Sequence, residues 1–423
     1  MINRRNIGKN VFFTSCGSGW KRVNMSVYLL FPLKKENLTS TALIPYLLER
    51  GTKDLPDNMA IRRKLLGMYG STLSTVYTTR YPYRVITVSI SGPDSAFTGD
   101  KAGDMLKAEL LLDALLDPYV ENGGFRGDWV EIEKPKLLDA INSIYNDKRD
   151  LCAEMLNQAA YDDERSLPFD GFADDLDSID GASLYGVYQD VLHQARVEIF
   201  YTGANADAVA DLCARRFAAF EFQGITPVFG APVDNIIPNE KRVTMDVEQD
   251  KLSMLFTTGK QGGLEDYNAL RQGSVILGGS AYSRLFNNIR EKQSLCYYIS
   301  SVQTLKPGLG IAVESGMSHE NLDRVINGVN DEITALGKNG PTPDEINTVR
   351  EVFKNSFASV RDSAGSIMGY YFNRLVRDGF MGEPEDELQD ILNVPVDSIT
   401  GIIGQMKLRA LSVVEPDCGN KES

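Results

Sequence analysis

The chain has 423 residues, of which 43% are hydrophobic and 24% charged, and its formal net charge is −14. This composition is ordinary for a folded chain, and the length predicts two or more domains, since domains usually hold about 100–200 residues. The acidic balance argues against nucleic acid and anionic membrane surfaces as partners, because both bind basic protein surfaces.

Histidine is scarce in this sequence. His193 and His319 are the only two, they lie far apart, and no HxxxH or CxxC pair occurs. A zinc site of the chain's own and a Ser-His-Asp or Cys-His nucleophile are therefore both disfavoured. Each histidine is interpreted as a surface or capping residue.

The cysteines and the lack of long apolar segments indicate the cellular compartment of the protein. The cysteines are scattered and odd in number, which favours free thiols in a reducing compartment; they are Cys16, Cys152, Cys213, Cys296 and Cys418. No stretch approaches the roughly 20 apolar residues of a membrane span. No apolar region with a cleavage site follows the basic N-terminus. We therefore expect a cytoplasmic protein that does not associate with membranes.

The first half begins with a strand over 24–33, which leads to a helix that ends at Gly51. A second helix is predicted over 60–70. The runs STLSTVYTT and YRVITVSISG, which follow it, are typical of strands. The later elements predicted for this half are helices over 100–116 and 129–148 and a strand over 197–204.

A proline-containing segment separates the two halves. Residues 223–242 hold three prolines and lack helical periodicity, which predicts an extended linker. The linker divides the chain into an N-terminal domain over 1–222 and a C-terminal domain over 243–423.

The second half repeats the order of the first. A strand over 251–259 precedes a helical stretch over 264–290, and the runs LCYYISSVQT and LGIAVESG predict two strands. A helix over 342–362 follows, with Thr342 and Glu345 forming a capping box. This internal repeat of an α+β unit, with strands before helices, predicts a mostly antiparallel or mixed sheet covered by helices on one side.

Residues 276–301, ILGGSAYSRLFNNIREKQSLCYYISS, resemble the C-terminal-half signature of the M16 (pitrilysin/insulinase) zinc metallopeptidases. That signature runs Gly-Gly, a small residue, Ser-Arg-Leu-Phe, Arg-Glu-Lys and a tyrosine that starts a strand. The resemblance extends to the duplicated halves, the Gly-Thr after the first helix and the helix led by TPDE. It implies an α+β fold of two homologous M16-type (LuxS/MPP-like) domains, each a mostly antiparallel sheet covered by helices.

Active members of that family carry HxxEH on the first helix, shortly before a Gly-Thr pair. Two histidines one turn apart share a helix face and bind zinc, and the glutamate between them activates the metal-bound water. Here TALIPYLLER precedes Gly51-Thr52, so the resemblance places Ala42 and Tyr46 at the histidine positions and Pro45 at the glutamate. None of the three can perform that chemistry.

The family's third zinc ligand is a glutamate on a later helix. The matching position is Ala140, beside Asp139. One carboxylate does not hold a zinc ion alone, so the resemblance implies that this chain has no metal ligands and no cofactor of its own.

Proline within the first helix also has a structural interpretation. If Thr41 capped the helix, Pro45 would lie in its first turn, where the missing N–H costs little; further along, it would kink the helix. In either case Leu43, Ile44 and Leu47 are expected in the core, and Gly51 is a natural C-terminal stop.

The other half of the family's active site is retained. M16 enzymes supply an arginine and a tyrosine, seven residues apart, that bind the substrate backbone and stabilise the tetrahedral intermediate, and Arg290 and Tyr297 match in type and spacing. The alternative is ordinary packing, with Arg290 in a surface ion pair and Tyr297 half-buried. Tyr298 faces the other side of its strand and is expected to be structural. Gly278 and Gly279 are expected to permit close packing or a turn.

The lost zinc motif and the retained pair together resemble one subunit of the heterodimeric M16B peptidases of bacteria. The resemblance implies that the chain is inactive alone and completes the zinc site of a homologous partner that carries HxxEH, for cleavage of peptides or unfolded proteins. The catalytic residues would be Arg290 and Tyr297, acting in trans, with zinc in the partner. The alternative is a non-catalytic peptide-binding or scaffold homologue.

Overall fold

The computed structural model describes residues 2–225, 238–304 and 308–417, and its contacts divide the chain into two compact units. Residues 1–142, 168–228 and 360–381 make the first unit, and residues 143–167, 229–359 and 382–423 make the second. Each unit therefore includes one segment from the other half of the sequence. Of the predicted linker, residues 226–237 lie outside the described part, and strand β9 begins at Asn239.

The first unit is built on a six-stranded sheet in the order β1-β2-β8-β3-β5-β4. Neighbouring strands are antiparallel except β2 and β8, which are parallel. The strands are β1 (Asn3–Gly8), β2 (Val11–Ser15), β3 (Arg22–Pro32), β4 (Thr72–Arg80), β5 (Tyr83–Pro93) and β8 (Arg196–Thr202). A short hairpin, β6 (Val120–Glu121) and β7 (Gly124–Phe125), lies apart from this sheet.

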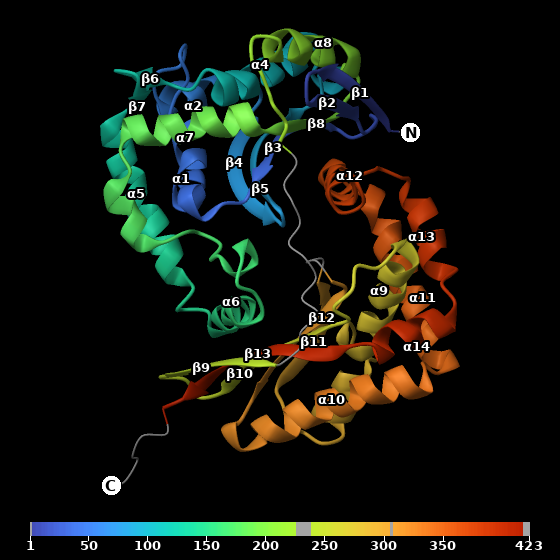
Figure 1. Cartoon of the computed structure of the whole chain (residues 1–423). Coiled ribbons are helices and arrows are strands. Elements are labelled where there is room, and N and C mark those ends of the chain that lie inside the picture. Colours follow the sequence, from blue (N-terminus) through green and yellow to red (C-terminus); the bar gives the residue numbers. More distant parts are fainter. Residues whose placement is uncertain (1, 226–237, 305–307, 418–423) are drawn as a thin grey trace. The chain divides into compact units, whose positions relative to one another are not determined.

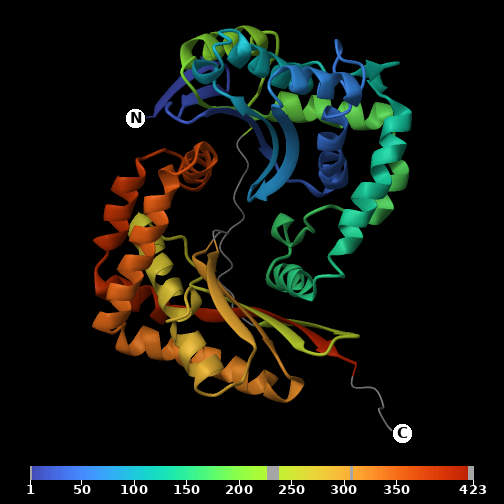
Figure 2. The same ribbon diagram turned by 180° about the vertical axis from the view of Figure 1, so that it is seen from behind.

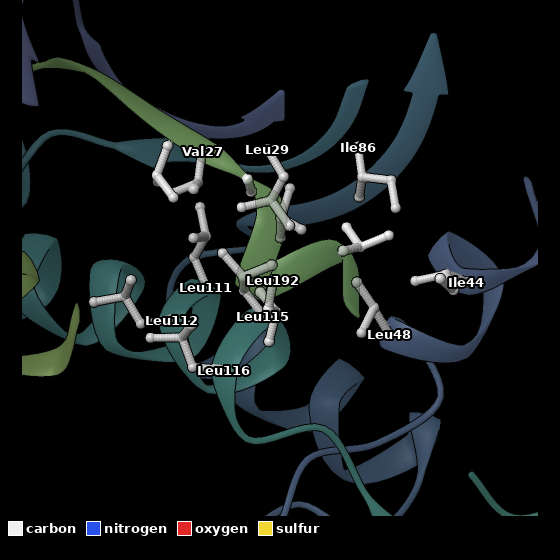
Figure 3. Packing of buried hydrophobic residues seen from close by; sticks show 14 of the residues in the cluster. Val27, Leu29, Ile44, Leu48, Ile86, Leu111, Leu112, Leu115, Leu116 and Leu192 are labelled. Atoms are coloured by element: carbon white, nitrogen blue, oxygen red, sulfur yellow. The ribbon is translucent and has the colours of Figure 1, made fainter. Parts of the chain in front are cut away.

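Successive side chains along each strand point to opposite faces of this sheet. Val27 and Leu29 of β3 belong to the main core, in which helices contribute residues such as Leu111 and Leu192 (Figure 3). The helices of this unit are α1 (Leu38–Leu48), α2 (Asn58–Gly67), α3 (Ser95–Thr98), α4 (Gly103–Leu116), α5 (Gly127–Ser143), α7 (Gly181–Gln194), α8 (Ala206–Phe217) and α12 (Ala364–Asp378).

The opposite face of the first sheet carries α12, a helix from the C-terminal half of the chain (Figure 1). Its Phe372 ring stacks on Tyr28 of β3 with centroids 3.8 Å apart. The expectation of helices on one side only is therefore wrong for this sheet. Helix α12 covers the second face, although it belongs to the half of the sequence that was expected to form the other domain.

The second unit has a five-stranded sheet in the order β11-β12-β10-β13-β9, antiparallel except between β13 and β9. The strands are β9 (Asn239–Met245), β10 (Asp250–Thr257), β11 (Tyr298–Thr304), β12 (Gly310–Met317) and β13 (Lys407–Pro416). Its helices are α6 (Lys148–Ala160), α9 (Leu264–Gly278), α10 (Leu322–Asn339), α11 (Pro343–Ala358), α13 (Pro384–Leu392) and α14 (Val396–Gly404).

Both faces of the second sheet are covered as well. The larger core lies between the sheet and a helical layer that includes α9 and the long α10, drawn in orange in Figure 2. On the other face, α6 places Leu151 and Met155 against Val414 of β13. Because α6 comes from the N-terminal half, the two units use the same device: a helix from the other half covers the second face of the sheet.

These findings confirm the predicted α+β fold of two domains with mostly antiparallel sheets. The capping box of Thr342 and Glu345 is present at the start of α11. The predicted helix over 129–148 is interrupted between α5 and α6, and the stretch over 264–290 is interrupted after Gly278. In the described part of the chain, no helix combines the length and apolar character needed to cross a membrane.

Candidate functional site

Helix α1 holds the three positions that the family resemblance places at the zinc motif. Ala42 and Pro45 are buried and Tyr46 is half-buried, so this part of the helix is packed into the core of the first unit. Neither an alanine methyl nor a proline ring can bind a metal or accept a proton. The residues at these positions therefore do not fit a zinc ion.

The start of α1 differs from one expectation. The helix begins at Leu38, directly after a 3₁₀ turn, so Thr41 lies inside it, and its hydroxyl donates to the Leu38 carbonyl over 2.8 Å. Thr41 is therefore not the N-cap, and Pro45 lies well inside the helix. The Pro45 carbonyl in turn accepts from the Thr75 hydroxyl of β4 over 2.6 Å, which ties α1 to the edge strand of the sheet.

Gly51 also differs from its expected role. The helix ends at Leu48 with Glu49 as a right-handed C-cap, so the stop does not depend on a glycine. A Cβ atom on Gly51 would lie 2.9 Å from the Trp129 ring. The glycine of the Gly-Thr pair is therefore needed for close packing against α5.

Acidic groups surround Tyr46. Burial raises the pKa of its phenol, and the charges of Asp170 and Glu133 raise it further. Glu133 of α5 is buried and forms ion pairs with Arg50 and Lys136. The sequence analysis singled out Ala140 on this helix and missed Glu133. The signal was present, because Glu133 is a charged residue within the otherwise apolar stripe of α5.

A buried arginine completes this cluster. The Tyr77 hydroxyl donates to Asp170, and the Arg84 guanidinium carbon lies 4.5 Å from the Tyr77 ring centroid. Burial lowers the pKa of Arg84 to about 10. The position that the zinc motif would occupy is thus beside a packed cluster of aromatic and charged groups. In the described ranges, no group of three or more His, Cys, Asp or Glu residues could hold a metal ion.

Arg290 lies in a single π-helical turn, Phe286–Glu291, after α9. Its guanidinium carbon lies 4.5 Å from the Phe286 ring centroid, and a guanidinium nitrogen lies 3.5 Å from the Glu291 carboxylate. With 37% of its side chain exposed, Arg290 is supported by a ring and still accessible to a ligand.

A tight turn joins this π-helix to strand β11. The Ser294 N–H donates to the Arg290 carbonyl, and the Leu295 N–H to the Ile289 carbonyl. Ser294 has a φ of 52°, in the left-handed region that few non-glycine residues adopt. Burial raises the pKa of the Cys296 thiol, and a hydrogen bond with Ser315 and the positive charge of Arg290 oppose that shift.

Tyr297 is held at two points, while the residue stays 54% exposed. Its N–H donates to the Gly316 carbonyl of β12 over 2.8 Å, and its hydroxyl lies 3.2 Å from the Ser318 hydroxyl. The structure therefore places Arg290 and Tyr297 at the two ends of one turn in the second unit. It does not test their catalytic role, which stays a prediction.

Tyr298 is half-buried, in contrast to its neighbour. The Arg149 guanidinium carbon lies 5.2 Å from its ring centroid and the Lys251 ammonium lies 5.6 Å from it. Burial raises the pKa of its phenol to about 12. Tyr298 thus links α6 to the sheet, and these side chains line an open depression of about 580 Å³.

The signature segment also has structural contacts. The Arg284 guanidinium binds the Glu345 carboxylate at 2.7 Å and the Gly340 carbonyl at 3.0 Å, so the Ser-Arg-Leu-Phe motif is tied to the capping box of α11. Gly278 lies against β11, where a Cβ atom would be 2.5 Å from the Ser301 nitrogen. The close-packing interpretation of Gly278 therefore agrees with the structure.

The two histidines and the cysteines have ordinary contacts. His193 is exposed and lies 3.1 Å from the Glu221 carbonyl, whereas His319 Nδ1 lies 3.1 Å from the carboxylate of the fully buried Asp250. The cysteines of the described ranges are free and buried, and they are Cys16, Cys152, Cys213 and Cys296. Cys418 lies outside those ranges.

Asp250 leads to a prediction about pH. Burial raises the pKa of its carboxyl, and the hydrogen bond from His319 opposes that shift. The folded chain therefore holds the Asp250 proton more tightly than the unfolded chain, and this group's contribution to stability is lost as pH rises through the folded-state pKa. We expect Asp250→Asn to gain stability relative to the wild type as pH rises from about 4 to neutrality.

Urea unfolding followed by circular dichroism, at steps across this range, measures the difference. Glu320→Gln is the control, because it removes an exposed negative charge from the turn that holds His319, the hydrogen-bond partner of Asp250. A repeat in a His319→Gln background tests the effect without the contact between the imidazole and the Asp250 carboxylate. A difference between Asp250→Asn and the wild type that does not change with pH would contradict the prediction.

Comparisons with known proteins agree with this architecture. Residues 178–353 match the family model described as "Peptidase M16 inactive domain". The chain is 27% identical over 384 residues to the "Probable inactive metalloprotease YmfF" of Bacillus subtilis (strain 168), which covers 90% of this chain and 89% of that protein.

Two solved structures share the fold over the whole chain. A conserved protein from Enterococcus faecalis V583 has a TM-score of 0.90 at 23% identity and covers 99% of this chain and 100% of that one. A peptidase M16 inactive domain from Pseudomonas fluorescens has a TM-score of 0.78 at 17% identity, with 99% of both chains covered.

At the positions of α1 aligned with the zinc motif, the chain holds an alanine, a proline and a tyrosine. Over residues 178–353 the chain thus resembles the M16 peptidase family, and its whole length shares the fold of an M16 inactive domain.

Proposed function

We propose that this chain is the zinc-less subunit of a heterodimeric M16B-type peptidase and contributes Arg290 and Tyr297 to the metal site of a homologous partner that carries HxxEH. Peptides or unfolded proteins are the proposed substrates. The zinc ion of the partner would polarise the scissile carbonyl and activate water. The proposal places no metal and no other cofactor in this chain.

The contrast between the two units carries this proposal. In the first unit the motif positions are packed as core, whereas in the second unit the Tyr297 phenol and the Arg290 guanidinium remain exposed. A phenol can donate a hydrogen bond to a developing oxyanion, and a guanidinium can bind substrate carbonyls. A scaffold has no need to keep both groups accessible at one turn.

The test compares the chain alone with the chain mixed with an HxxEH-bearing homologue from the same genome. Zinc content, complex formation and peptide cleavage are measured for each sample. We expect no cleavage by the chain alone and zinc-dependent cleavage by the complex. A stable complex without cleavage would overturn the proposal in favour of a peptide-binding or scaffold role.

A matched control separates a contribution in trans from simple stabilisation of the partner. The partner is assayed alone and with the Arg290→Ala variant of this chain. We expect the variant to form the complex but to raise KM, because the guanidinium would bind the peptide backbone before the chemical step. Unchanged kinetics in the variant complex would remove Arg290 from the proposed site.

A further inference from the structure

The Tyr297 hydroxyl has a neighbour that sequence reasoning did not single out. Ser318 follows the last residue of β12, and its hydroxyl oxygen lies 3.2 Å from the phenol oxygen, with either group able to donate. The Tyr297 N–H is bound two residues earlier on the same segment, at the Gly316 carbonyl. Tyr297 is therefore held to one short piece of chain at both its backbone and its hydroxyl.

The position of Ser318 is fixed by the turn that begins there. Ser318 has extended backbone angles before a 3₁₀ turn, His319–Asn321, and its carbonyl accepts from the Asn321 N–H over 2.9 Å. On one side Met317 is fully buried and pairs with Asp250, and on the other His319 binds the Asp250 carboxylate. A serine anchored on both sides can hold a neighbouring hydroxyl in one orientation.

The direction of this hydrogen bond decides what the phenol can do. A tyrosine hydroxyl has one proton to donate. If Ser318 donates, the phenol oxygen accepts, and its proton stays available for another acceptor. Accepting a hydrogen bond also makes a hydroxyl a better donor, because successive hydrogen bonds polarise one another.

We propose that Ser318 is a positioning residue, which donates to Tyr297 and leaves the phenol proton free for the substrate's developing oxyanion. This inference rests on the proposed function, since the oxyanion would form at the partner's metal site. It assigns Ser318 no contact with the substrate. The proposal requires that a change at Ser318 alters kcat only when the Tyr297 hydroxyl is present.

The experiment is a double-mutant cycle in the complex with the HxxEH-bearing partner. Ser318→Ala is expected to lower kcat by about 3–10-fold with little change in KM, as expected for one hydrogen bond between uncharged groups. Ser318→Thr keeps the hydroxyl and is expected to restore most of the rate. In a Tyr297→Phe background, Ser318→Ala is expected to have no further effect, because the phenol oxygen is absent.

Two controls keep the outcome decisive. Ser356→Ala makes the same change on an exposed position of α11 and should leave kcat unchanged. In the chain alone, the ¹³C resonance of Tyr297 Cζ should shift in Ser318→Ala but not in Ser356→Ala, since this carbon responds to hydrogen bonds at the phenol oxygen.

The possible failures can be told apart. An equal loss of kcat from Ser318→Ala in the Tyr297 and Phe backgrounds would show a merely structural effect and overturn the inference. An unshifted Cζ resonance would show that the hydrogen bond is absent in solution, with the same consequence. A wild-type complex without activity would instead overturn the proposed function, and the catalytic purpose of Ser318 with it.

Discussion

Tyr297→Phe is expected to lower the turnover of the assembled peptidase by about 10²–10³-fold, the usual cost of removing one oxyanion donor. The substitution removes a single oxygen from a ring that is 54% exposed, so the fold of the second unit should be unaffected. The loss should appear in kcat more than in KM, since the oxyanion exists only in the transition state and its intermediate. Steady-state cleavage of a fluorogenic peptide measures both constants.

Tyr298→Phe is the matched control for this prediction. It removes the same oxygen from the adjacent residue, whose half-buried ring packs against Arg149 and Lys251 instead. We expect the Tyr298 variant to keep its turnover, and both variants to form the complex with the partner in size-exclusion chromatography. Equal turnover of the Tyr297 variant and the wild type would remove the tyrosine from the mechanism.

The parts of the fold that sequence reasoning predicted correctly depend on local signals. Strand β3 and the capping box at Thr342 follow from patterns within about 20 residues of chain, whereas strands β1, β2, β9 and β13 were not predicted. The exchange of α6 and α12 between the two halves was not predicted. The sheet against which an amphipathic helix packs is decided by contacts between segments far apart in sequence. A local sequence pattern does not contain that information.

The candidate site shows the same division. Arg290 and Tyr297 lie in one continuous segment, so their type and spacing could be read directly from the sequence. The cluster around Tyr46 could not, because the β4–β5 hairpin with Tyr77 and Arg84 lies far from both Tyr46 and Asp170 in the sequence.

Two expectations about α1 were incomplete for a physical reason. Thr41 has the chemistry of an N-cap, but the preceding 3₁₀ turn runs directly into the helix and moves its start to Leu38. Gly51 has the chemistry of a helix stop, but its place against the Trp129 ring decides its identity. The neighbouring turn decides the first case, and tertiary packing decides the second.

The second large effect is expected at Gly278, where α9 ends against the strand that follows Tyr297. A Cβ atom there would lie 2.5 Å from the Ser301 nitrogen and 2.9 Å from the Ser301 hydroxyl, so helix and strand must separate to admit it. Overpacking of this kind costs about 1–3 kcal/mol. We therefore expect Gly278→Ala to destabilise the second unit by that amount.

Gly401→Ala is the control, because Gly401 lies inside α14 of the same unit with open space around a Cβ atom. This substitution should raise the free energy of unfolding by about 0.5–1 kcal/mol, since alanine loses less backbone freedom than glycine when a helix forms. Both tryptophans, Trp20 and Trp129, belong to the first unit, so amide hydrogen exchange of β11 is the better measurement. If Gly278→Ala left β11 exchange unchanged, the close approach of α9 would not support the strand. If exchange quickened and turnover of the complex fell with it, the glycine of the signature would be needed to place Tyr297 at the site.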